Sequence, residues 1–408
     1  MYPLPIFALI ALLTLNTRLM SEPCLVINLK GVTERIRAQN PDLAAARFRI
    51  DEALGRMKQT GRLKNPELET SLENNADFRE GKLEVGFSQR FPITGRLSLE
   101  KGISVTELKS AEAEICEMER QLVAGAKTSM IRVLAIRQRR ELLRNQIALA
   151  SEFSEKLSAA SKKGEGSALD AATARLEVAS ISAQIRQLDA EEAAAVGELK
   201  PLLGMHAGES ISVGGTLAPP SIPESDVNPA LRPDFQAAML EVDAARQGMD
   251  LQQALRYDDV EAGLFAAAER TEDVPNGYDN EGIFGLRFRI PLPLWNNNEG
   301  AIEEANATHE RRKLEATALA RHIRLEAESD RAQMIQWAKL IRELDETLLP
   351  LAAEQSKAAS DAFDQSQTNI LTVFRAREKS LQLAATRLDA LREFHLARVR
   401  HEASLGNH

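Results

Sequence analysis

Two stretches of this chain change from strand-like alternation to helix-like repetition, and they constrain the fold more than any other feature. The clearer one is residues 282–300, GIFGLRFRIPLPLWNNNEG. Its apolar residues occupy alternate positions, as on one face of a β-strand: Phe284, Leu286, Phe288 and Ile290. The positions between them, on the opposite face, are Gly285, Arg287 and Arg289. Pro291 and Pro293 then end the strand, because proline cannot donate to a sheet ladder. The same event occurs in residues 82–96, KLEVGFSQRFPITGR, so the sequence predicts two copies of one structural unit.

An internal repeat supports this interpretation. When residues 40–57 are shifted by 192 positions onto residues 232–249, seven of the eighteen residues are identical. The identities are Pro41/Pro233, Asp42/Asp234, Ala45/Ala237, Ala46/Ala238, Asp51/Asp243, Ala53/Ala245 and Met57/Met249. We therefore predict a leader over residues 1–28, a first repeat over 29–202, a linker over 203–229 and a second repeat over 230–408.

Each repeat is predicted to contain two strands, at about 67–75 and 82–91 in the first and about 258–268 and 282–291 in the second. Segments of nine to eleven residues that are apolar on one side have the length and pattern of transmembrane β-strands. Nine of the eighteen aromatic residues fall in 65–96 or 257–295. Several lie near strand ends or in the connecting loops, as interfacial girdles require: Phe78, Phe91, Tyr257, Tyr278 and Trp295. A soluble hairpin packed on helices has a similar pattern.

Four strands cannot close a barrel that holds a pore, and open sheet edges are not tolerated in lipid. The barrel must therefore be shared between chains. Three chains give twelve strands, a number inferred from closure and symmetry. Its water-filled lumen is predicted to be lined by the polar faces of the strands, through Glu69, Glu73, Glu84, Arg90, Arg287 and Arg289.

Most of the remaining chain is predicted to be helical. Residues 98–163 contain no proline, and a helix of that length spans about 100 Å. The chain turns at Gly164, Gly166 and Ser167, and again near Asn369, with a kink predicted at Pro350. The fold class is thus mainly α, with duplicated long α-helical hairpins in a coiled-coil tunnel and a small membrane β part.

Composition removes several other classes of function. A net charge of −9 gives no support to a nucleic-acid partner. The two cysteines, Cys24 and Cys116, provide neither a disulfide framework nor a thiolate metal site, and the spacing of His401 and His408 does not fit a helical zinc pair. The apolar run from Leu4 to Leu15 matches a secretory signal. Glu22 and Pro23 disfavour lipidation of Cys24, although it stays an alternative.

The chain resembles the TolC-type outer-membrane efflux family, and within it the branch that exports cobalt, zinc and cadmium. The segments that carry the resemblance are NPDLAAAR, RPDFQAAM, QRFPITGR, FGLRFRIPLPLWNNNEGAIEEANA and GEGSALDAATARLEVA. The resemblance implies a homotrimer in the outer membrane of a Gram-negative bacterium, with a twelve-stranded barrel and a helical tunnel across the periplasm. It also implies that the tips dock on a periplasmic adaptor protein and an inner-membrane pump of the resistance-nodulation-division type. The residues we expect there are Gly164, Gly166, Ser167 and Asn369.

One segment departs from the family pattern. Related channels carry acidic residues near the start of the final helix, where this chain has Thr372 and Arg375. The first repeat retains Asp170. If charge gates the periplasmic mouth, Asp170 is the candidate for an acidic ring, with Arg375 as a partner. The alternative is that Asp170 only stabilises the first turn of its helix.

The leading hypothesis is a passive exit channel with no cofactor, no bound metal and no catalytic residue, driven by a pump elsewhere. No Ser/His/Asp set, phosphate-binding loop or carboxylate pair stands out in the sequence. The alternative is a soluble periplasmic coiled-coil adaptor or scaffold without a membrane barrel. A divalent metal cation as substrate is favoured by the resemblance alone, and organic solutes remain open.

Overall fold

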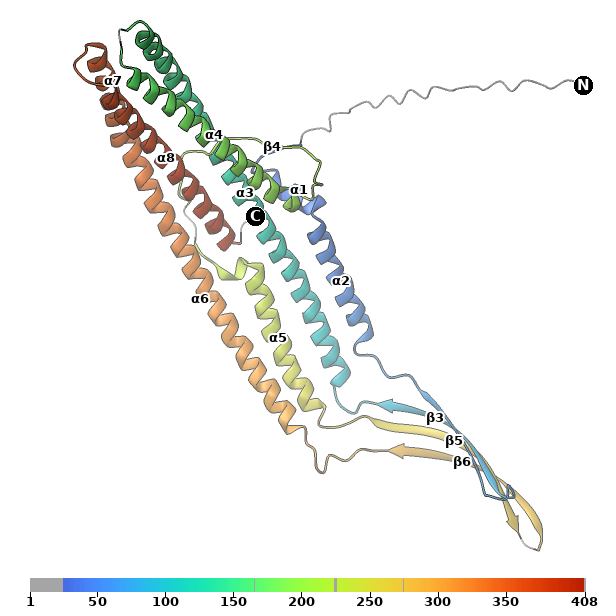
Figure 1. Cartoon of the computed structure of the whole chain (residues 1–408). Helices are drawn as coiled ribbons and strands as arrows, with labels where there is room; N and C mark the ends of the chain where they lie inside the picture. Colours follow the sequence, from blue (N-terminus) through green and yellow to red (C-terminus); the bar gives the residue numbers. More distant parts are fainter. Residues whose placement is uncertain (1–24, 165, 224–225, 274, 407–408) are drawn as a thin grey trace, which may run out of the picture.

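The computed structural model describes residues 25–164, 166–223, 226–273 and 275–406, and these form an elongated molecule (Figure 1). A bundle of long helices makes up one end, and a four-stranded sheet extends from the other. The chain is therefore mainly α-helical with a small β part, as predicted. None of the described helices is both long enough and apolar enough to cross a membrane.

The elements follow the predicted duplication. The first repeat contains α1 (Val32–Gln39), α2 (Pro41–Gln59), β2 (Glu67–Asn74), β3 (Gly81–Phe91), α3 (Arg96–Lys162) and α4 (Ala168–Leu202). The second contains the 3-10 turn η1 (Pro229–Leu231), α5 (Pro233–Ala254), β5 (Val260–Asp273), β6 (Gly277–Arg289), α6 (Glu299–Glu343), the π-helix η2 (Leu344–Leu348), α7 (Leu349–Asp364) and α8 (Ile370–Ser404).

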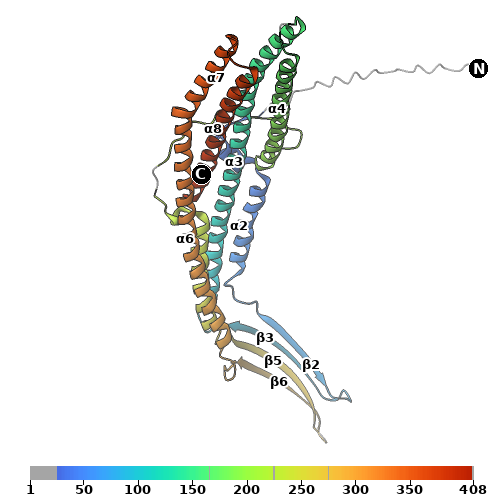
Figure 2. The same ribbon diagram turned by 60° about the vertical axis from the view of Figure 1, so that its left-hand side comes forward.

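Two short helices stack end to end beside each long one. α2 and α4 pack along α3, whereas α5 and α8 pack along α6 (Figures 1 and 2). The 67 residues of α3 span about 100 Å at 1.5 Å per residue. The main core lies where the stacked helices meet, and its fully buried side chains include Met130, Ile131, Leu199, Met334 and Phe394.

The junction between α4 and α2 depends on a buried asparagine and a glycine. The Asn40 side chain accepts from the Leu43 N–H (2.8 Å), and its amide donates to the Leu202 carbonyl (2.9 Å). Gly204 has a φ of 66°, and a Cβ there would lie 2.0 Å from the Gln39 carbonyl oxygen. Only glycine permits this close approach of the two chain segments.

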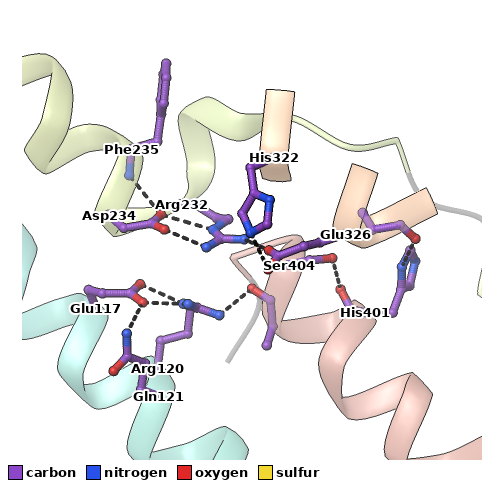
Figure 3. Close-up of polar contacts among 12 residues, drawn as sticks. Glu117, Arg120, Gln121, Arg232, Asp234, Phe235, His322, Glu326, His401 and Ser404 are labelled. Atoms are coloured by element: carbon purple, nitrogen blue, oxygen red, sulfur yellow. Dashed lines mark hydrogen bonds and ion pairs between the residues drawn. The ribbon is translucent and has the colours of Figure 1, made fainter. Parts of the chain in front are cut away.

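The junction between α8 and α5 uses charged residues at the matching position (Figure 3). Arg232, which the repeat aligns with Asn40, is buried and pairs with Asp234 and with Glu326 (3.1 Å). Arg120 of α3 donates to the Ala403 carbonyl near the end of α8 (2.9 Å) and pairs with Glu117. The two repeats therefore reach the same helix stacking with different polar groups.

The sheet has the strand order β2-β3-β5-β6, and all its neighbours are antiparallel. β5 and β6 are longer than predicted, because residues expected to form a loop near 272–280 continue the ladder to the pair Asp273↔Gly277. Backbone pairing does not need apolar alternation, and the Arg270 guanidinium stacks on the Tyr278 ring at 3.9 Å from its centroid. Tyr278 thus lies in β6 rather than in the connecting loop.

One boundary differs in detail from the prediction. The kink expected at Pro350 is the π-helix Leu344–Leu348, which precedes that proline. Such a π-helical insertion accommodates a residue that cannot donate to the helix ladder. By contrast, α4 ends at Leu202, the last residue of the predicted first repeat.

The expected leader and linker both contain ordered backbone. Residues 1–24, with the apolar run and Cys24, lie outside the described residues, so export and lipidation stay predictions. However, the predicted leader also included Leu25–Ile27, which form β1 and pair in parallel with β4 (Ile211–Val213) of the linker. Because Ile27 and Val213 are buried against the main core, the folded part begins before residue 29.

Candidate functional site

The register of the sheet gives it one apolar face and one polar face. Since alternate residues point to opposite sides, the pairs Leu72↔Leu83 and Leu264↔Leu286 fall on one face, and Ser71↔Glu84 and Glu261↔Arg289 on the other. The apolar face is exposed to its surroundings: its large side chains are Leu68, Leu72, Leu83, Val85, Phe87, Leu264, Phe284, Leu286 and Phe288, with Phe284 87% exposed. An exposed apolar surface of this size indicates contact with lipid or with another protein.

The polar face is connected by ion pairs that cross the strands. Near the helices, Glu261 is 6% exposed and binds both Arg90 (3.3 Å) and Arg289 (3.1 Å). In the middle of the sheet, Arg287 binds Glu84 and lies 3.5 Å from Glu69. Charged groups that pair with one another on one face can remain hydrated there, which suits a water-filled lumen.

All six residues predicted to face a pore lie on this polar face: Glu69, Glu73, Glu84, Arg90, Arg287 and Arg289. The same face carries further charged residues that were not among those predicted, namely Glu67, Lys82, Glu261, Glu269 and Glu281. Their place in the alternation was a sufficient signal for Glu67 and Glu261. For Glu269 and Glu281 the signal was absent, because the prediction ended β5 at residue 268 and began β6 at residue 282.

A large aromatic residue also lies on the polar face. The Phe265 ring covers Gly285 of the neighbouring strand, where a Cβ would lie 2.4 Å from ring carbons. The Arg287 guanidinium lies 5.1 Å from the centroid of the same ring, so its charge is held by Phe265 as well as by carboxylates. The glycine therefore allows a side chain of unusual size to lie flat against the polar face.

The two outer strands of the sheet each have one unpaired side. β2 pairs only with β3, and β6 pairs only with β5, within the described part of the chain. A long unpaired edge next to an apolar face is unstable in lipid, because its N–H and C=O groups have no partners there. Another chain must pair with these edges if the sheet lies in a membrane.

The opposite end of the molecule carries two helix tips. Gly164, with a φ of 76°, and Gly166 lie in the turn between α3 and α4. Ser167 and Asn369 cap α4 and α8, because their side chains accept from the N–H groups of Asp170 (3.4 Å) and Thr372 (3.0 Å).

The capping geometry shows that Asp170 and Thr372 occupy the same position in their helices, three residues after the cap. Arg375 lies one turn further along α8 and is exposed. The structure does not join Asp170 and Arg375 in an ion pair, and neither side chain has one among the described residues. Their predicted partnership is therefore not formed within one chain.

An aromatic cluster that sequence analysis missed joins the tips. The Phe153 ring of α3 contacts Phe363 of α7 and Phe374 of α8, with centroids 5.6 and 6.0 Å apart, and Arg377 lies 5.0 Å from its centroid. Close by, Glu177 of α4 is partly buried. Burial, together with the neighbouring Glu378 carboxylate, raises the pKa of Glu177 above its ordinary value. No group of three or more His, Cys, Asp or Glu in the described ranges could hold a metal ion.

Comparison with known proteins agrees with this architecture. Residues 32–205 match the family described as outer membrane efflux protein. The cobalt-zinc-cadmium resistance protein CzcC of Cupriavidus metallidurans is 24% identical over 394 residues, which cover 93% of this chain and 87% of that protein.

Solved structures of low identity share the fold. A CusC structure has a TM-score of 0.79 at 15% identity and covers 93% of this chain and 92% of that one. The outer membrane protein VceC of Vibrio cholerae has a TM-score of 0.74 at 17% identity, with 93% and 96% covered. The open-state MtrE outer membrane channel of Neisseria gonorrhoeae has a TM-score of 0.75 at 13% identity, with 93% and 89% covered.

Proposed function

Because residues 32–205 match the outer membrane efflux protein family and the chain is similar to CzcC along most of its length, we propose that it forms the exit channel through which a pump complex expels divalent metal cations. The protein is an outer-membrane channel component, and it extends from the outer membrane into the periplasm. The soluble adaptor, our earlier alternative, is not favoured. The matched family is one of efflux proteins, not of enzymes.

The observation that carries the channel function is the two-faced sheet. Its apolar face has the length and exposure that a membrane-spanning wall needs, while its opposite face carries charges that pair with one another. A sheet with water on its charged face and lipid on its apolar face has a favourable environment on each side. A soluble adaptor is surrounded by water, which would leave the apolar face of the sheet exposed to solvent.

Members of this family function as trimers with adaptor and pump partners. We propose the same for this chain, with β6 of one subunit pairing with β2 of the next. Since these edges run antiparallel in the observed strand order, three copies close a barrel of twelve strands without a parallel pair. The tip residues Gly164, Gly166, Ser167 and Asn369 are our candidates for contact with the adaptor.

Six residues of the polar face are the proposed lining of the barrel: Glu69, Glu73, Glu84, Arg90, Arg287 and Arg289. We further propose that Asp170 gives the periplasmic mouth a ring of three carboxylates. In this proposal Thr372 leaves the equivalent position of α8 uncharged, and Arg375 can reach Asp170 only across a subunit boundary. Carboxylates near a narrow mouth attract cations and bind divalent ions more strongly than monovalent ones.

The cation substrate rests on the similarity to CzcC, which covers 93% of this chain. Growth of a deletion strain on a panel of cobalt, zinc, cadmium and organic antimicrobials tests it. We expect tolerance to at least one of the three metals to fall, and to return when the gene is supplied on a plasmid. Loss of tolerance to organic compounds alone would refute the cation substrate but leave the channel function intact.

A further inference from the structure

The apolar face of β6 continues beyond the end of the strand. β6 ends at Arg289, yet its alternation of exposed apolar residues goes on through Ile290, Leu292 and Leu294, which are 60%, 68% and 66% exposed. Pro291 separates Ile290 from Leu292 and keeps this part of the backbone extended, and the chain then bends at Pro293 before Leu294. The lipid-facing surface of the sheet therefore extends toward the helices by several residues that belong to no ladder.

The second repeat is longer than the first at this joint. Three residues separate Pro92 from α3, whereas seven separate the equivalent Pro291 from α6. The longer joint contains Leu294 and Trp295. The Leu294 N–H donates to the Leu292 carbonyl (2.8 Å), which bends the chain at Pro293. Figure 2 shows the resulting loop beside the lower end of α6.

Trp295 is 94% exposed in this loop. An indole has a large apolar body and one N–H donor, so tryptophan is enriched at membrane–water boundaries and is seldom left fully in water. Its position just beyond the lipid-facing strand is the level at which such a boundary lies.

An unpaired cation lies next to this loop. A shallow hollow is lined by Arg256, Asp258, Leu292 and Trp295, together with the side chains of Gln252 and Asn298. Arg256 is exposed, and within the described ranges its guanidinium forms no ion pair. Two other arginines near the base of the sheet are engaged, since Arg96 binds Asp259 and Arg289 binds Glu261.

We propose that the segment Ile290–Trp295 and Arg256 form a phospholipid-binding anchor at the periplasmic boundary of the membrane. The acyl chains contact Ile290, Leu292 and Leu294, and the phosphate of an acidic headgroup pairs with Arg256 beside the Trp295 ring. The occupant is lipid because the apolar segment is continuous with the lipid-facing side of the sheet. This inference rests on the proposed channel function.

The chain provides a favourable probe, because Trp295 and Trp337 are its only tryptophans. Trp337 is partly buried against the main helical core. The experiment reconstitutes the full-length channel into vesicles whose phosphatidylcholine carries bromine near the glycerol end of its acyl chains. Tryptophan fluorescence is compared between wild type and Trp295→Phe, and the difference is the emission of Trp295. The substitution leaves Trp337 and the helical core unchanged.

We expect bromine to remove most of the emission that is lost with Trp295→Phe and to leave the emission of Trp337 nearly unchanged. We also expect stronger quenching by bromine near the glycerol than by bromine near the methyl end. If bromine leaves the emission of Trp295 unchanged, the anchor is refuted. Quenching by acrylamide would then show that Trp295 lies in water, and no quenching by acrylamide would show that a neighbouring subunit covers it.

Arg256 is tested with brominated phosphatidylglycerol in place of brominated phosphatidylcholine. One basic group near an anionic surface favours binding by about five-fold. Quenching of Trp295 is therefore expected to require about five-fold less phosphatidylglycerol in wild type than in Arg256→Gln. Equal requirements would remove Arg256 from the anchor.

Conductance of the same vesicles separates this inference from the channel itself. A preparation that conducts ions but whose Trp295 is not quenched refutes the anchor and leaves the channel standing. A preparation that floats with the vesicles but does not conduct, or does not insert at all, refutes both.

Discussion

At the scale of single residues, the proposed role of Asp170 at the periplasmic mouth can be tested by removing its charge. Asp170 lies in the first turn of α4 and forms no ion pair in the described part of the chain. If it contributes to a ring at the mouth, Asp170→Asn should raise single-channel conductance and weaken block by divalent cations in planar bilayers. A carboxylate there that only stabilises the helix is worth about 0.3–1 kcal/mol, and its loss would leave the block unchanged.

The repeat supplies a matched control for this prediction. Thr372 occupies the equivalent position in α8, so Thr372→Asp adds a carboxylate to the second tip of each subunit. We expect this variant to strengthen block by divalent cations. Unchanged block in both variants would remove Asp170 and Thr372 from the proposed gate.

Glu261 allows a second test at the same scale. Glu261→Gln leaves Arg90 and Arg289 without their shared carboxylate at the end of the sheet near the helices. The reversal potential in a salt gradient should shift toward anions. Stability should fall by about 1 kcal/mol, less than for a fully buried pair, because both arginines can be hydrated.

Glu73→Gln is the control for Glu261→Gln. It removes the same charge from the same face, but Glu73 forms no ion pair among the residues described. We therefore expect a change in selectivity without a loss of stability. An equal loss of stability in both variants would show that the ion pairs of Glu261 do not contribute as proposed.

At the residue scale, alternation alone identified the polar face. It could not identify the ion pairs, since those depend on which strands are neighbours. The paired residues of β3 and β5 are 169 to 189 positions apart in the sequence, and this pairing brings Arg90 to Glu261. Nor does any local pattern indicate the cluster of Phe153, Phe363 and Phe374, because each ring comes from a different helix.

At the scale of elements, the packing of the helix tips depends on the cluster of Phe153, Phe363 and Phe374. α7 has a single buried residue, Ala352, so the contact of Phe363 with Phe153 is a large part of what holds its end. An aromatic pair contributes about 0.5–1.5 kcal/mol beyond its buried area. We expect Phe153→Ala to accelerate amide hydrogen exchange in α7 and the start of α8. Exchange in α5 should not change, and unchanged exchange in α7 would contradict this role.

The linker between the repeats is predicted to be sensitive to pH through His395 of α8. His395 is buried, and its Nε2–H donates to the Ala218 carbonyl of the linker (2.8 Å). Burial lowers the pKa of His395, the Ala218 hydrogen bond opposes that shift, and among nearby charges Arg398 adds to it and Glu402 opposes it. The unfolded chain binds a proton at this histidine more readily than the folded chain does. The contribution of His395 to the free energy of unfolding is therefore complete above the unfolded pKa of about 6.5 and is lost as pH falls below it.

Thermal unfolding checks this prediction. The melting temperature of wild type should fall between about pH 7.5 and pH 5.5 more than that of His395→Gln, whose amide keeps a donor but does not titrate in this range. Equal falls in the two proteins would show that other groups set the pH dependence.

At the scale of elements, the lengths of the helices and the positions of the turns followed from glycine, proline and capping residues. The ends of β5 and β6 did not, because polar residues continue the ladder beyond the apolar segment. β1 was also not predicted. Its three residues are a strand only because β4, far along the sequence, pairs with them.

For the whole molecule, the internal repeat predicted the duplicated long helical hairpins, and the need to close a sheet predicted that the barrel is shared between chains. The proposed number of subunits rests on closure of the barrel, since neither outer strand, β2 nor β6, has a second neighbour in the described part of the chain. Native mass spectrometry of the detergent-extracted protein should therefore give about three times the 45.0 kDa of the intact chain, less any leader that is removed. A monomer at every protein concentration would refute the shared barrel.

The most direct test of the central claim is spin labelling along β6. Labels placed one at a time at residues 284–289 report access to oxygen, which concentrates in lipid, and to a water-soluble nickel complex. We predict that oxygen access peaks at positions 284, 286 and 288 and that nickel access peaks at 285, 287 and 289. Two faces equally open to water, or an apolar face closed to both reagents, would contradict the claim that these strands separate lipid from a water-filled lumen.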